Sequence, residues 1–111
     1  MTGTCLQLDL DRRVHKRHAV TVDVFWHGRN GRSRGTVSDI GHAGCFVLSG
    51  DEVSDGQTVH VFLPIGGGMK AQFTGVVTNH EESIGFAVRF DHVTEPQREI
   101  LERLIGEHTD V

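Results

Sequence analysis

The stretch Ala19-Val20-Thr21-Val22-Asp23-Val24-Phe25-Trp26 alternates apolar and polar residues and is rich in β-branched and aromatic types. Such alternation is typical of a β-strand with one buried face. The residues that follow, Gly28-Arg29-Asn30-Gly31, contain an Asn-Gly pair, which is a strong signal for a hairpin turn. The sequence therefore predicts a β-hairpin whose second strand runs from about Ser33 to Ile40.

Four further short runs have strand character. They cover residues 45–48, 58–63, 70–78 and 84–90, and the connections between them are rich in Gly, Asp and Ser. We expect the segment from Pro64 to Gly68, with its three consecutive glycines, to end the fourth strand. Trp26 and the six phenylalanines mostly fall in these runs, so their expected role is core packing.

The pattern changes to a helical period near residue 94. Thr94-Glu95-Pro96-Gln97 has a hydroxyl N-cap, an acid and a proline in the first turn, and Gln at the capping-box position. Gly106 is the expected stop, and the apolar stripe before it consists of Ile100, Leu101, Leu104 and Ile105. We therefore predict a mainly β fold, a six-stranded antiparallel barrel with one C-terminal helix over an open end or a flank.

Length and composition limit the class of protein. A chain of 111 residues is enough for one compact domain, which we place at residues 12–108 after a flexible segment at residues 1–11. The net charge of −4 argues against general nucleic-acid binding. No apolar run approaches the roughly 20 residues of a membrane helix, and no secretory signal is present. Cys5 and Cys45 fit no zinc or redox spacing, so we expect reduced thiols in a cytoplasmic protein without membrane insertion.

A dense cationic cluster, Arg12-Arg13-Val14-His15-Lys16-Arg17-His18, lies just before the first strand. It carries four fixed positive charges on an acidic chain, so its expected target is a compact anion. Arg suits such a target better than Lys, because its planar fork pairs two acceptors at once and stacks on flat rings. The alternative is a solvated basic arm without a ligand.

A second element, Asp39-Ile40-Gly41-His42-Ala43-Gly44, falls between the second and third strands. Together with the earlier Arg12-Arg13-x-x-x-Arg17, it resembles the PilZ domain family, whose signature is Arg-Arg-x-x-x-Arg followed by Asp/Asn-x-Ser-x-x-Gly. The likeness covers about residues 11–107. It includes the strand Gly85-Phe86-Ala87-Val88-Arg89-Phe90 and the closing helix.

The resemblance implies a six-stranded antiparallel barrel that binds the bacterial second messenger cyclic di-GMP. It assigns ligand contacts to an N-terminal segment that wraps over the ligand and to the turn, namely to Arg12, Arg13, Arg17, Asp39, Gly41 and Gly44. The chemistry of these residue types agrees. A guanidinium matches guanine O6 and N7 or phosphate oxygens, and a carboxylate accepts from the guanine N1–H and N2–H2 edge. Glycine leaves room for a ligand and permits backbone conformations forbidden to other residues.

Two details qualify the match to the family. Gly41 stands where the family has Ser, so a hydroxyl group that bonds the ligand is missing, which is worth about 1 kcal/mol or tenfold in affinity. His42 or a water is a candidate replacement, because imidazole both donates and accepts, and His15 is a further candidate ligand residue. Arg12 stands where other members have a bulky aliphatic residue, which implies a stacked pair of cyclic di-GMP molecules per site.

We therefore expect a cyclic di-GMP receptor in which binding orders residues 10–18 and presents a new surface to a downstream protein. The main alternative is a degenerate PilZ-like interaction module that binds a protein and no nucleotide, for which Gly41 argues. A barrel that binds single-stranded nucleic acid ranks last, because the chain is acidic and lacks tyrosine. No catalytic motif is present and the eight histidines lack metal-site spacing, so no enzyme activity, metal or cofactor is expected.

Overall fold

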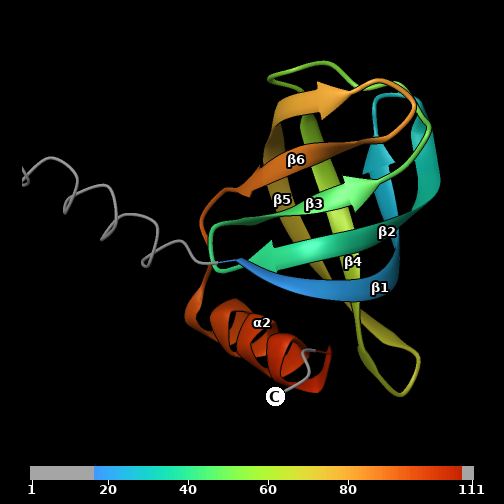
Figure 1. Cartoon of the computed structure of the whole chain (residues 1–111). Coiled ribbons are helices and arrows are strands. Elements are labelled where there is room, and N and C mark those ends of the chain that lie inside the picture. Colours follow the sequence, from blue (N-terminus) through green and yellow to red (C-terminus); the bar gives the residue numbers. More distant parts are fainter. Residues whose placement is uncertain (1–16, 109–111) are drawn as a thin grey trace, which may run out of the picture.

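Residues 17–108 are described in a computed structural model of the chain, and they form six strands followed by one helix (Figure 1). These elements are β1 (Arg17–Gly28), β2 (Gly31–Gly41), β3 (Gly44–Leu48), β4 (Thr58–Gly66), β5 (Met69–Glu81), β6 (Gly85–Phe90) and α2 (Glu95–His108). The predicted fold class, a six-stranded antiparallel barrel with a C-terminal helix, is confirmed. Within this part of the chain, no helix is long and apolar enough to cross a membrane.

The strands close into a barrel in the order β1-β2-β3-β6-β5-β4, and all neighbours are antiparallel. Closure depends on β1 and β4, which pair over Phe25–His27 and His60–Phe62. Two residues further along, the same register would join Asp23 to Pro64, and proline has no N–H to donate. The seam that closes the barrel is therefore three residue pairs long.

Alternating side chains fill the interior of the barrel. In β1 the inward residues are Val20, Val22, Val24 and Trp26, as the sequence pattern predicts. The Trp26 ring packs edge-on against Phe86, with the ring centroids 4.8 Å apart. The same core contains Val37, Ile40, Cys45, Val47, Val59, Val61, Leu63, Phe73, Val77, Val88 and Phe90. Burial of a large apolar side chain stabilises the fold by about 1.5–3 kcal/mol.

Three of the six phenylalanines do not belong to this core, so the expectation for them was wrong. Phe25, Phe46 and Phe62 are only partly buried, and each lies between two fully or nearly fully buried strand neighbours. Adjacent residues in a strand face opposite sides of the sheet. Phe25 therefore faces outward because Trp26, the next residue, faces inward.

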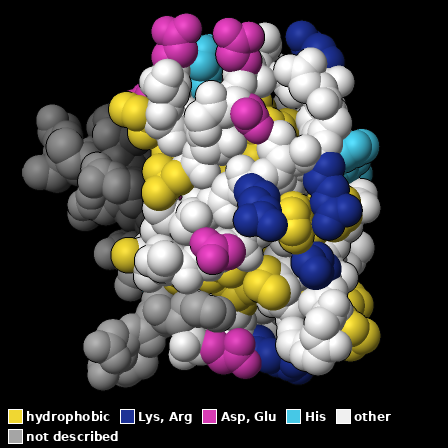
Figure 2. All heavy atoms as spheres, turned by 90° about the vertical axis from the view of Figure 1, so that its right-hand side faces the viewer, with side chains coloured by type: hydrophobic (Ala, Val, Ile, Leu, Met, Phe, Trp, Pro, Cys, Tyr) yellow, Lys and Arg dark blue, Asp and Glu magenta, His cyan; other side chains and the backbone are white. Residues whose placement is uncertain are grey.

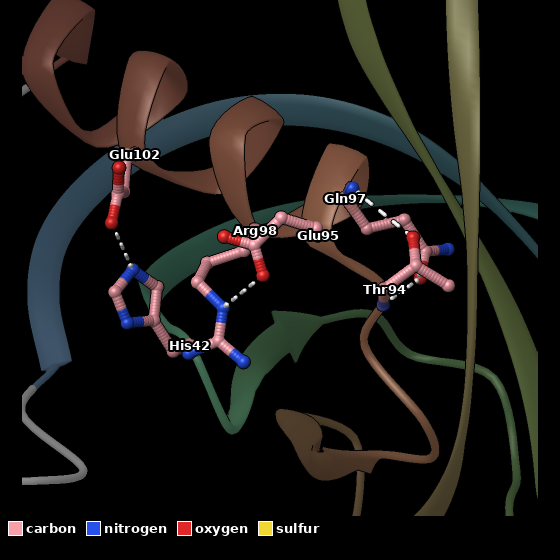
Figure 3. Close-up of polar contacts among 6 residues, drawn as sticks. All are labelled: His42, Thr94, Glu95, Gln97, Arg98 and Glu102. Carbon is pink, nitrogen blue, oxygen red and sulfur yellow. Dashed lines mark hydrogen bonds and ion pairs between the residues drawn. The ribbon is translucent and has the colours of Figure 1, made fainter.

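Helix α2 begins with the capping box that the sequence predicts. The Thr94 main-chain N–H donates to Gln97 Oε1 (2.9 Å), and the Gln97 N–H donates to Thr94 Oγ1 (3.3 Å) (Figure 3). Leu101 and Leu104 are buried in the barrel core. The helix lies against β1 and β2 at one end of the barrel, so its predicted position is confirmed (Figure 1).

Several predicted ends of elements were wrong, and β5, for example, continues to Glu81 instead of ending at residue 78. Helix α2 continues to His108 instead of ending at Gly106, because a single glycine costs a helix only about 1 kcal/mol. Strand β4 continues through Pro64 to Gly66, where it pairs with β5 beyond the end of the β1 seam. On that open side of β4 no partner requires the missing N–H, so proline is tolerated.

Close approach of neighbouring backbones explains three glycines of the barrel wall. An added Cβ atom would lie 2.0 Å from a main-chain carbonyl oxygen at Gly44, 2.3 Å from one at Gly75 and 2.3 Å from one at Gly85. These oxygens belong to strand backbones and cannot rotate away as a side chain would. The three positions therefore admit no side chain without movement of a strand.

We expect Gly75→Ala to lower the free energy of unfolding by about 1–3 kcal/mol or more, because its methyl group overlaps the Arg89 carbonyl oxygen. Gly106→Ala is the matched control. Its methyl group has no neighbour within 4 Å, and alanine favours a helix, so stability should hold or rise by up to about 1 kcal/mol. Urea unfolding followed by the fluorescence of Trp26, the single tryptophan, measures both variants. Equal stability of Gly75→Ala and the wild type would contradict the close approach.

Candidate functional site

Arg17 and Asp39 form the centre of the described part of the predicted site, at the start of β1 and near the end of β2. Arg17 Nη1 donates a hydrogen bond to Asp39 Oδ1 over 2.5 Å. In the β1–β2 register Arg17 faces Gly41, and Ala19 faces Asp39, so the charged side chains are diagonal neighbours on the outer face. Gly41, the residue that faces Arg17 across the ladder, has no side chain.

A bulge in β2 turns Asp39 outward. Val37 and Ile40 are both fully buried although they are three positions apart, so the alternation of the strand breaks between them. The register with β3 shifts by one at the same place, which leaves Ser38 as an extra residue on β2. With unbroken alternation Asp39 would share the inward face of Val37.

Solvent exposure decides what this ion pair contributes. The side chains of Arg17 and Asp39 are 40% and 37% exposed, and such pairs stabilise a fold by about 0–1 kcal/mol. The contact uses one N–H group of a guanidinium that has five, and one of two carboxylate oxygens. The pair therefore presents further donors beside an acceptor on an open surface, an arrangement that suits a polar ligand.

His42, in the connection between β2 and β3, faces the C-terminal helix. Its Nε2 lies 3.4 Å from Glu102 Oε2, as Figure 3 shows, and both side chains are partly exposed. The two side chains are within ion-pair distance of each other. The described contact thus links the predicted ligand-binding turn to α2.

Packing explains Gly44, and neither motif glycine adopts an unusual backbone conformation. Neither Gly41 nor Gly44 is among the described residues with positive φ, so the expected use of a conformation forbidden to other residues was wrong. Gly44 faces Arg89 of β6, and an added Cβ would overlap the Val88 carbonyl oxygen. Gly41 is buried at the end of β2.

Arg12, Arg13 and His15 lie outside the described residues, so their ligand roles stay predictions. Arg17 and His18 are already part of β1 and pair with β2. The first strand therefore begins two residues earlier than the expected start, and the prediction that binding orders residues 10–18 was wrong for these last two. Arg17 is positioned by the barrel wall.

Cys45 lies beneath the ion pair, on the inner side of the barrel wall. It faces Ile40 in the β2–β3 register and is completely buried. Burial raises the pKa of its thiol from 9.0 to about 12, while the Arg17 charge lowers this pKa and the Asp39 charge raises it by smaller amounts. The thiol is neutral at physiological pH and acts as a small apolar packing group.

The largest of the described hollows lies away from the predicted site residues. Its volume is about 500 Å³, and its lining comes from the β1–β2 turn, residues 50–54 and the β5–β6 turn. Size alone does not make it the functional site, because none of the motif residues lines it and loop side chains dominate its wall. Within residues 17–108, no group of three His, Cys, Asp or Glu side chains is placed to hold a metal ion.

The sequence analysis missed two features of the site. The partner of His42, Glu102, is 60 positions away on an element whose docking depends on the whole barrel. The bulge at Ser38 did leave a signal, because Val37 and Ile40 are apolar residues at a spacing that an unbroken strand cannot bury on one face.

The barrel and its closing helix carry two sequence motifs that meet at Arg17 and Asp39, and this combination is typical of one domain family. The sequence matches the PilZ domain over residues 11–107, and the chain belongs to the PilZ domain family. No curated protein matches the sequence.

Several solved structures share the fold. The PilZ domain of YcgR from Escherichia coli, solved with c-di-GMP, has a TM-score of 0.69 and 16% identity over 87% of this chain and 91% of that domain. Borreliella burgdorferi PlzA in complex with c-di-GMP has a TM-score of 0.68 and 13% identity over 93% of this chain. Bacillus subtilis MotI/DgrA, an inhibitor of motility, has a TM-score of 0.68 and 15% identity over 86% of this chain. This chain spans 46% of PlzA and 50% of MotI/DgrA.

We expect Cys45 to react with a thiol reagent only when the barrel unfolds, which labelling in a Cys5→Ser background measures. The thiol also makes stability depend on pH. The unfolded thiol ionises near pH 9.0 and the folded one near pH 12, so the unfolded state loses its proton first and stability falls as pH rises through this window. Cys45→Val should remove this part of the alkaline loss. An unchanged alkaline profile in that variant would contradict the assignment.

Proposed function

We propose that this chain is a receptor for cyclic di-GMP, which binds on the outer face of the barrel where β1 begins and β2 ends. The meeting of Arg17 and Asp39 as partly exposed neighbours is the observation that supports the proposal most. Membership of the PilZ family supports the same ligand, as does likeness in fold to two proteins solved with c-di-GMP.

The chemistry of the ion pair fits the two guanines and two phosphates of this ligand. The remaining N–H groups of Arg17 match O6 and N7 of a guanine or the oxygens of a phosphate. The Asp39 carboxylate accepts from the N1–H and N2–H2 edge of a guanine. Because each side chain already holds the other in place, less conformational entropy is lost when the ligand binds.

Arg12 and Arg13 complete the site in this proposal. They precede β1 closely enough for residues 10–16 to close over a ligand seated beside Arg17. Closing this segment costs conformational entropy, which charge-assisted bonds to the phosphates must exceed. Arg12 supports binding of a stacked pair, so we expect a ratio near two ligands per chain.

In this proposal, ligand binding affects the rest of the protein and its partner in two ways. One is the closed N-terminal segment, which together with the nucleotide forms a new surface for a downstream protein. The other is His42, whose contact with Glu102 joins the ligand-binding turn to α2. Movement of the turn would therefore change a contact between the turn and the helix.

Gly41 supports a second candidate function. Without the hydroxyl group of the family motif, the barrel would serve as an interaction module that binds a downstream protein and no nucleotide. Gly41 lies directly opposite Arg17, so the missing group belongs to the centre of the site. Titration with the nucleotide separates the two functions.

Isothermal titration calorimetry with cyclic di-GMP, and with GTP as the control ligand, tests the receptor proposal. We expect saturable binding of cyclic di-GMP alone. Arg17→Ala and Asp39→Ala should each weaken it about tenfold to a hundredfold, because each removes hydrogen bonds to a charged group worth about 1.5–3 kcal/mol.

Arg103→Ala is the matched control, since this exposed arginine lies on α2 outside the motifs. The Arg17–Asp39 pair adds little to stability, so the three variants should unfold at nearly the same urea concentration as the wild type. Wild-type affinity in Arg17→Ala and Asp39→Ala would show that the ligand binds elsewhere. No heat with the wild type at high ligand concentration would favour the nucleotide-independent module.

Gly41→Ser should tighten cyclic di-GMP binding by about tenfold, because it returns the hydroxyl group of the family motif. The backbone at Gly41 lacks positive φ, so its conformation is one that a serine can adopt. Gly50→Ser, at an exposed position remote from the motifs with open space around it, is the control and should leave the affinity unchanged. Calorimetry of both variants measures the effect, and an unchanged or weaker affinity in a folded Gly41→Ser would show that no hydroxyl acts there.

A further inference from the structure

A second hollow lies on the outer wall of the barrel, at the far end of β1 from Arg17. Its volume is about 370 Å³, and it is lined by Asp23, Val24, Phe25, Arg34, Gly35, Thr36 and Lys70. Figure 2 shows the side of the molecule that is on the right in Figure 1, where Lys and Arg side chains gather around hydrophobic atoms. The residues of this wall take no part in the proposed nucleotide site.

Three cations surround one aromatic ring here. The guanidinium carbon of Arg32 lies 4.2 Å from the centroid of the Phe25 ring, and Arg34 and Lys70 place their charges 5.7 Å from it. Among the described residues no acid forms an ion pair with any of the three. Like charges gathered around one ring repel each other, and one phenyl ring offsets only part of that repulsion. An anion bound among them would offset more, so the patch favours an anionic partner.

The strand geometry sets the shape of the partner. Arg32 and Arg34 lie two residues apart on the outer face of β2, so their side chains leave the strand roughly 6.6 Å apart. Alternate side chains of an extended peptide have the same spacing. Beside them the β1–β4 ladder has already ended at Phe25, so the main chain of Asp23 has no ladder partner in β4. An extended peptide matches the spacing of the cations and lies beside a stretch of β1 that is not paired with β4.

Nucleic acid fits the same patch less well. The near face of the Phe25 ring is occupied by Arg32, so it offers a base no open stacking platform on that side. Asp23 lines the hollow, where its carboxylate accepts a hydrogen bond from Thr36 (3.1 Å), and the whole chain carries a net charge of −4. A polyanion longer than the patch would meet this negative surface, whereas a short acidic segment would not.

We infer that the patch formed by Phe25, Arg32, Arg34 and Lys70 is a docking surface for an extended acidic segment of a partner protein, with Asp or Glu at alternate positions. The acidic side chains of the segment pair with Arg32 and Arg34, and Lys70 closes the far side of the hollow. This surface is separate from the proposed cyclic di-GMP site and does not depend on it.

Fluorescence anisotropy with labelled synthetic peptides tests the inference. The probe is an eight-residue peptide of alternating Glu and Val, and its control has the same composition with the four Glu residues grouped together. We expect saturable binding of the alternating peptide, weaker binding of the grouped peptide, and at least a tenfold loss in Arg32→Glu/Arg34→Glu. Lys70→Glu, on another strand, should weaken binding in the same direction.

The matched control is Arg98→Glu/Arg103→Glu, which changes the net charge equally through exposed residues of α2. It should bind the alternating peptide nearly as well as the wild type. Trp26 fluorescence confirms that each variant is folded, and the Arg32→Glu/Arg34→Glu variant should keep any affinity for cyclic di-GMP. Failure of the peptide test therefore leaves the receptor proposal untouched.

Several outcomes would overturn the inference. They are absence of saturable peptide binding, equal affinity for the two peptides, and equal loss in the α2 control. Tighter binding of an eight-nucleotide oligothymidylate through the same arginines would assign the patch to nucleic acid instead. Self-association in sedimentation that Arg32→Glu/Arg34→Glu abolishes, without peptide binding, would assign it to a second copy of the chain.

Discussion

The register between β1 and β2 is the constraint on which the rest of the structure depends. At one end of the hairpin it places Arg17 opposite Gly41 and beside Asp39, and at the other end it places Phe25 opposite Arg34. Because side chains alternate along a strand, a slip of one residue would turn Trp26 to solvent and Arg17 toward the core. The burial of the β1 core residues therefore holds both outer surfaces in place.

The positively charged side chains of this protein are concentrated in two regions. The chain is acidic overall, yet its cations concentrate in the N-terminal basic stretch and around Phe25. The PilZ family relationship accounts for the first of these groups only. A small barrel can carry two such surfaces because its wall is continuous, and the two ends of one strand are far enough apart for screening by salt to make them independent.

The sequence predicts the elements of this fold better than their contacts. Alternation, the Asn30-Gly31 turn and the Thr94–Gln97 capping box are local signals, and all three lie where the structure has a strand, a turn and a helix start. The bulge at Ser38, the contact of His42 with Glu102 and the short seam between β1 and β4 depend on which elements become neighbours. The expected ends at Gly106 and Pro64 were wrong for another reason, because one glycine costs a helix little and a strand tolerates proline where no partner needs its N–H.

The short seam also determines where the barrel can open. Strands β1 and β4 pair over three residues, whereas β4 and β5 pair over eight, so separating β4 from β1 disrupts less strand pairing than separating it from β5. Local fluctuations follow the least costly opening. The β1–β2 hairpin would then swing outward on β3, with α2, packed against both of its strands, as the latch. Pro64 lies just beyond this short seam, so the amides that join β1 to β4 should exchange with solvent faster than those that join β4 to β5.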